Sequence, residues 1–116
     1  MTYRVAYRIQ WISEGGIELT IRKERFGDVL DVTLQGRLDA ASSQLLETEM
    51  EQSYNGLHEL NIDIRGLEYI SSAGLRVLLS AQRRMNRQGV MTLSRTTEQV
   101  QNVLDATGFS DMMLIC

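Results

Sequence analysis

Short runs in which apolar and polar residues alternate are separated by stretches with helical spacing. The alternation predicts strands in five segments, at residues 17–21, 29–34, 60–64, 90–93 and 112–115. Gly27 and Asp28 stand between the first two, so that pair is expected to form a hairpin with Gly36 at its end.

Apolar residues at helical spacing predict three helices. The first is expected to begin at Asp39 or Ser42, either of which can cap it, and to end at Gly56. Its predicted inward positions are Leu45, Leu46 and Met50, and its predicted solvent positions are Glu47, Glu49 and Glu51. The second follows Ser71 and Ser72, and the third spans residues 98–106 before Gly108. Strands separated by helices favour an α/β fold in which helices back a sheet.

Residues 1–16 have a strand pattern of their own, followed by a flexible break. The alternating positions are Tyr3, Val5, Tyr7, Ile9 and Trp11. We therefore divide the chain into an N-terminal extension, residues 1–16, and one domain, residues 17–116. We favour an extra strand for the extension, and a dimer contact or a loosely ordered segment are the alternatives.

Composition indicates one domain without catalytic or metal-binding chemistry. The 116 residues are 43% hydrophobic, and a net charge of −3 gives no indication of direct nucleic-acid binding. With Cys116 as the one cysteine and His58 as the one histidine, no zinc site, disulfide or catalytic triad can be assembled. We predict no cofactor, no metal and no enzymatic activity. Without a long apolar run we expect a protein of the cytoplasm that does not enter membranes.

The most informative segment is the strand of residues 60–64 leading into Ser71 and Ser72. These serines stand at the start of the second helix, where free backbone N–H groups and the helix dipole favour an anion. A serine in this position can simply cap the helix, or it can carry a phosphate without disturbing the fold.

Three short motifs resemble the STAS domain of bacterial anti-sigma-factor antagonists. They are Gly36-Arg37-Leu38-Asp39, Ile70-Ser71-Ser72-Ala73-Gly74-Leu75 and Thr107-Gly108-Phe109. The resemblance begins at about Gly16 or Ile17 and implies a mixed sheet with helices mainly on one face, in the order β-β-α-β-α-β-α-β. It also implies that Ser72 is the phosphorylated residue. Ser71, which stands where many members carry aspartate, is the second choice.

Basic residues gather on one side of the second helix. They are Arg76, Arg83, Arg84 and Arg87, with Ser80 among them. This side is either a solvated face whose cations favour the helix C-terminus, or a docking surface for an acidic partner. In the family it resembles, this helix faces an anti-sigma factor that is also a serine kinase. The candidate contact residues are Asp39, Ser71, Gly74, Arg76, Ser80 and Arg83.

The resemblance therefore predicts a phosphorylation-controlled binding switch. The unmodified chain would bind an anti-sigma factor with serine-kinase activity and release a sigma factor, and a serine phosphatase is a further candidate partner. One alternative is a constitutive STAS interaction subunit of a lipid-transport or signalling assembly. The other is a small enzyme with Asp39, Asp63 and Ser72 around one pocket, which lacks a base for the serine. We expect a monomer, with a dimer through residues 1–16 left open.

Overall fold

The computed structural model describes residues 5–12, 18–94, 97–108, 111 and 114–115. In this part of the chain the strands are Val5–Ile12 (β1), Leu19–Phe26 (β2), Val29–Leu38 (β3), Glu59–Ile70 (β4), Val90–Ser94 (β5) and Leu114–Ile115 (β6). The helices are Ala40–Glu51 (α1), Ser72–Asn86 (α2) and Glu98–Thr107 (α3). The predicted order of elements is confirmed from β2 onward.

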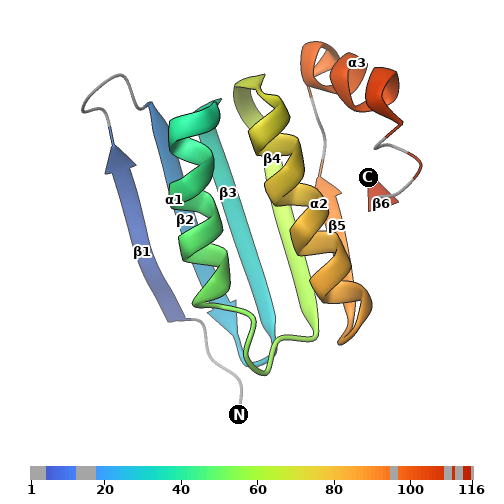
Figure 1. Ribbon diagram of the computed structural model, residues 1–116. Coiled ribbons are helices and arrows are strands. Elements are labelled where there is room, and N and C mark those ends of the chain that lie inside the picture. The colour runs from blue at the N-terminus through green and yellow to red at the C-terminus, as the bar shows by residue number, and fades with distance from the viewer. Residues whose placement is uncertain (1–4, 13–17, 95–96, 109–110, 112–113, 116) are drawn as a thin grey trace.

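One mixed sheet contains all six described strands, in the order β1-β2-β3-β4-β5-β6. β1, β2 and β3 pair antiparallel, whereas β3, β4, β5 and β6 pair parallel. α1 and α2 lie side by side over one face of this sheet (Figure 1). The α/β architecture expected from the sequence, a mixed sheet backed by helices, is confirmed, including the hairpin of β2 and β3. None of the helices in the described residues has the length and apolar character needed to cross a membrane.

β1 and β6 are the outermost of the described strands of the sheet. β1 lies within the N-terminal extension and pairs with β2 from Val5 opposite Arg25 to Ile12 opposite Leu19. The extra strand is therefore present, and its neighbour is the strand that begins the domain. The boundary drawn at residue 16 stays a prediction. At the other end, β6 covers the second half of the predicted last strand, and residues 112–113 lie outside the described residues.

Alternation along the strands separates a buried apolar face from a polar one. Leu19, Ile21, Leu30, Val32 and Leu34 are at most 2% exposed and belong to the core between the sheet and the helices. The intervening positions lie on the opposite face of β2 and β3, where four of them line a small polar depression. These four residues are Thr20, Arg22, Thr33 and Gln35.

β3 continues two residues past Gly36, where the hairpin was expected to end. Gly36 has φ +106°, and a Cβ at this position would collide with the backbone carbonyl of Glu18. The next residue, Arg37, donates its N–H to that same carbonyl at 2.7 Å. Only glycine combines this backbone conformation with so close an approach, so β3 can run on to the start of α1.

The expectation that Glu49 faces water is wrong. Its carboxylate is buried and forms an ion pair with the ammonium group of Lys23 on β2, with 2.9 Å between Oε2 and Nζ. Lys23 also donates to Ser53 Oγ at 3.1 Å. Glu49 follows Leu46 by three residues and so lies on the inward side of α1. The pair ties α1 to β2, while Leu45, expected inside, is half-buried.

Removing one partner of this ion pair should destabilise the fold strongly, because a buried charge loses its counter-charge. We expect Glu49→Ala to lower the free energy of unfolding by about 3–5 kcal/mol. Glu47→Ala, an exposed site on the same helix, should change it by no more than about 0.5 kcal/mol. Urea denaturation of the two variants measures the difference, and equal losses would contradict the structural role of the pair.

Candidate functional site

The parallel pairing of β3 and β4 brings two helix N-termini to the same edge of the sheet. Leu38, the last residue of β3, is opposite Ile70, the last residue of β4. Ser71 then donates its N–H to the Leu38 carbonyl at 2.8 Å. α1 and α2 begin directly after this contact, so the candidate residues at their N-termini, Asp39, Ser71 and Ser72, are neighbours.

Asp39 caps α1 through a reciprocal pair of hydrogen bonds. Its Oδ1 accepts from the Ser42 N–H at 3.0 Å, and Ser42 Oγ accepts from the Asp39 N–H at 2.9 Å. Of the two predicted caps, Asp39 is therefore the N-cap, and Ser42, the third helical residue, completes the capping box. The Ser42 backbone hydrogen bond is the main cause that lowers the pKa of Asp39 below its ordinary value of 3.8. The half-buried side chain therefore supplies a carboxylate at neutral pH.

The two serines at the start of α2 have different environments. Ser71 is half-buried and caps the helix, since its Oγ accepts from the Gly74 N–H at 3.1 Å. Ser72 is the first helical residue and is exposed. Within the described part of the chain, the Ser72 hydroxyl makes no hydrogen bond. Of the two hydroxyls, the one at Ser72 is accessible to another molecule.

Gly74 is buried where α2 passes close to β3. A Cβ at this position would lie 2.8 Å from Leu38 Cγ and 3.0 Å from the Leu38 carbonyl oxygen. This contact requires glycine and fixes the first turn of α2 against the end of β3. The structure thus gives Gly74 a packing role, and its contribution to partner binding stays a prediction.

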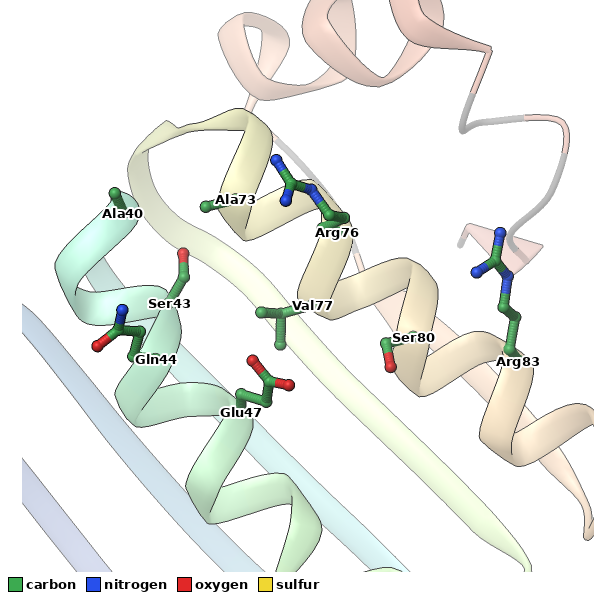
Figure 2. Close-up of a pocket in the computed structure, with 9 residues that line it drawn as sticks. All are labelled: Ala40, Ser43, Gln44, Glu47, Ala73, Arg76, Val77, Ser80 and Arg83. Carbon is green, nitrogen blue, oxygen red and sulfur yellow. The ribbon is translucent and has the colours of Figure 1, made fainter.

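An open groove of about 510 Å³ runs between α1 and α2, and its position is shown in Figure 2. α1 contributes Ala40, Ser43, Gln44 and Glu47, and α2 contributes Ala73, Arg76, Val77, Ser80 and Arg83. Three of the predicted contact residues, Arg76, Ser80 and Arg83, are exposed and line it together. The groove therefore has a mixed lining, with apolar side chains such as Val77, a cationic wall on α2 and the carboxylate of Glu47 on α1.

The remaining arginines of the predicted basic side differ in their surroundings. Arg84 stacks over the ring of Tyr54, with 4.9 Å from its guanidinium carbon to the ring centroid. Burial raises the pKa of Tyr54 to about 12. Arg87 is the C-terminal cap residue of α2. Arg84 thus serves to hold α2 against the residues after α1, and neither arginine lines the groove.

Sequence reasoning missed the α1 wall of the groove and an aromatic contact at the ends of the strands. Glu47 is exposed, as expected, but its position opposite α2 depends on how the two helices pack. Arg37 lies over the Tyr69 ring at 4.4 Å, and Tyr69 is 41% exposed. Arg37 and Tyr69 are opposite each other in the register of β3 and β4. The contact could therefore be predicted only if that register were known.

The enzyme alternative does not match the geometry. Asp63 occupies a position of β4 between buried Ile62 and Ile64, and its carboxylate pairs with Arg65 at 2.7 Å. Its side chain therefore lies on the sheet face opposite α1 and α2, away from the N-terminal ends where Asp39 and Ser72 stand. These three residues do not line one pocket in the described structure.

Comparison with known proteins identifies the family of this chain. The family model described as the STAS domain matches residues 20–116. BtrV of Bordetella bronchiseptica, named as an anti-sigma factor antagonist, is 31% identical over 93 residues, covering 78% of this chain and 80% of BtrV. The anti-sigma F factor antagonist of Paenibacillus polymyxa is 26% identical over 102 residues, covering 85% of this chain and 87% of that protein.

Solved structures give the same fold. The anti-sigma factor antagonist SpoIIAA in its unphosphorylated form superposes with a TM-score of 0.73 at 16% identity, covering 83% of this chain and 87% of SpoIIAA. The phosphorylated form of SpoIIAA from Bacillus gives a TM-score of 0.67 at 15% identity, covering 83% and 90%. With the motifs, the mixed sheet and these relatives in agreement, the chain belongs to the STAS-domain family of anti-sigma factor antagonists, which are non-enzymatic regulators.

Proposed function

We propose that this chain is an anti-sigma factor antagonist controlled by phosphorylation of Ser72. The unphosphorylated chain binds an anti-sigma factor with serine-kinase activity and thereby releases a sigma factor. Phosphate on Ser72 ends the binding. One observation carries the proposal: Ser72 offers an exposed hydroxyl at the first residue of α2, while the hydroxyl of Ser71 is engaged as the helix cap.

The position of Ser72 suits a modification that changes the surface and leaves the fold intact. The hydroxyl projects from the N-terminal end of a helix, where the dipole and free N–H groups stabilise negative charge. Because Ser72 supplies no capping hydrogen bond, adding a phosphate there removes no interaction from the fold. SpoIIAA, a relative of the same fold, has been solved in both an unphosphorylated and a phosphorylated form.

The partner surface in this proposal is the edge formed by the two helix N-termini together with the groove. Asp39 and Ser71 stand at the edge, and Arg76, Ser80 and Arg83 follow along α2. The cationic wall fits an acidic segment of the anti-sigma factor. Gly74 contributes by letting the first turn of α2, which carries Ser72, pack closely against the end of β3.

A phosphate at this edge changes the electrostatics enough to act as a switch. It adds a charge of about −1.5 to −2 beside the Asp39 carboxylate, at a surface that fits a neutral hydroxyl. Reversing a bound fraction from 99:1 to 1:99 requires a differential of about 5.5 kcal/mol. Repulsion between the phosphate and nearby carboxylates, together with the cost of desolvating a dianion in a closed interface, weakens binding.

The first test is whether Ser72 carries the regulation. Site-mapping mass spectrometry of protein isolated from its native cells should find phosphate on Ser72 that varies with growth conditions. In calorimetric titrations against an anti-sigma factor kinase of the same organism, Ser72→Ala should bind with or without ATP. The wild-type chain should bind about 10,000-fold more weakly once phosphorylated, which corresponds to the differential of about 5.5 kcal/mol. Phosphorylated protein that binds as tightly as unmodified protein would favour the constitutive interaction subunit.

The second test concerns the cationic wall of the groove. Arg83→Glu reverses a charge at the proposed interface, so we expect binding of the anti-sigma factor to weaken by about 10-fold or more, mainly at low salt. Arg22→Glu is the matched control, because Arg22 is an exposed arginine on the opposite face of the sheet. Equal effects of both variants would mean that net charge, and not this groove, governs the interaction.

The third test uses the free energy of unfolding to distinguish the serine that caps α2 from the serine proposed to carry the phosphate. Ser71→Ala should lower the free energy of unfolding by about 1 kcal/mol, because the Gly74 N–H loses its acceptor. Ser72→Ala should stay within about 0.5 kcal/mol of wild type, since its exposed hydroxyl makes no bond within the described residues. Chemical denaturation of both variants checks this, and the reverse order would assign the cap to Ser72.

A further inference from the structure

Arg76 follows Ser72 by four residues on α2, which makes the two side chains neighbours on one side of the helix. Both are exposed. Long helical side chains point back toward the helix N-terminus, and the Arg76 guanidinium indeed reaches toward the first turn of α2, where Ala73 lies (Figure 2). Within the part of the chain that the structure describes, this guanidinium makes no hydrogen bond or ion pair.

The charges around Ser72 leave Arg76 as the natural counter-ion for a phosphate there. Asp39, at the N-terminus of the neighbouring helix α1, is a carboxylate and would repel the phosphate. Glu47, on the α1 wall of the groove, is acidic as well. Arg37 stacks on Tyr69 and lies close enough to Asp39 to lower its pKa. Arg83 is eleven residues from Ser72, or about 16 Å along the helix axis.

We propose that phosphoserine at position 72 is held by the guanidinium of Arg76 within the same helix. This inference rests on the proposed function for the identity of the phosphorylated residue. An arginine can donate two parallel N–H bonds to phosphate oxygens, a geometry that fixes the phosphate against the first turn of α2. The same contact takes Arg76 out of the cationic wall, where unmodified protein offers it to an acidic partner.

The modification then acts in two ways at once. It adds negative charge at the sheet edge, and it occupies the cation of the groove nearest that edge. A carboxylate introduced at position 72 carries one charge and fewer acceptor oxygens than phosphate, so it occupies Arg76 less completely. Phosphorylation of Ser71 would not give this pairing, because Arg76 is five residues away and the hydroxyl that caps α2 would be consumed.

The pairing can be tested on the full chain without any partner protein. We would incorporate phosphoserine at position 72 during translation and follow its second ionisation by ³¹P NMR as a function of pH. An adjacent guanidinium stabilises the dianion, so Arg76→Gln should raise the phosphoserine pKa by about 0.5 unit relative to the otherwise unchanged phosphoprotein. Arg76→Lys, which keeps the charge but loses the bidentate geometry, should fall between the two.

Arg83→Gln is the matched control, because it removes the same charge from the same wall of the groove at a greater distance. The phosphoserine pKa should change by no more than about 0.1 unit in this variant. A pKa that is the same with and without Arg76, or that rises equally in both glutamine variants, would overturn the proposal. Amide NMR spectra of each variant establish that the fold is retained.

This experiment and those on the proposed function fail independently. Phosphoserine is supplied by translation, so pairing with Arg76 is observed or excluded whether or not native cells modify Ser72. Conversely, loss of partner binding on phosphorylation can occur by repulsion alone when Arg76 is not engaged.

Discussion

The parallel pairing of β3 with β4 is the constraint on which the site depends. It aligns Leu38 with Ile70. The hydrogen bond from the Ser71 N–H to the Leu38 carbonyl then joins the point where β3 leads into α1 to the point where β4 leads into α2. Because a helix starts after each strand, two helix N-termini open at one edge, each with its own capping residue. An exposed hydroxyl and a carboxylate become neighbours although they are more than thirty residues apart in the sequence.

Close backbone approaches give this edge its shape. Gly36 lets β3 pass the Glu18 carbonyl, and Gly74 lets α2 rest against Leu38. The buried pair of Lys23 and Glu49 fixes α1 over β2 from the other end. The position of the groove thus follows from contacts that lie outside it, and side chains from α1 and α2 line its two walls.

The sequence predicted the elements well because period-two and helical spacing are local signals. It failed at Glu49, where the charge suggested solvent although the spacing from Leu46 and Met50 indicated the inward side. The partner, Lys23, alternates with buried Leu19 and Ile21 on a strand 26 residues earlier, and only the packed fold brings the two together. For the same reason the α1 wall of the groove, with Ser43 and Glu47, could not be predicted from the sequence. The distinction between Ser71 as cap and Ser72 as exposed residue depends on where α2 begins to within one position, which local patterns do not define.

The polar face of the sheet, opposite α1 and α2, has a practical consequence. Thr33 lies there among Thr20, Arg22 and Gln35, on the side of β3 that faces away from the groove. A cysteine introduced at Thr33 would give an attachment point for a surface or a fluorophore, with Cys116 as the only competing thiol. A molecule tethered in this way would present α1 and α2 to the solution, so single binding events with other proteins could be observed without obstruction by the tether.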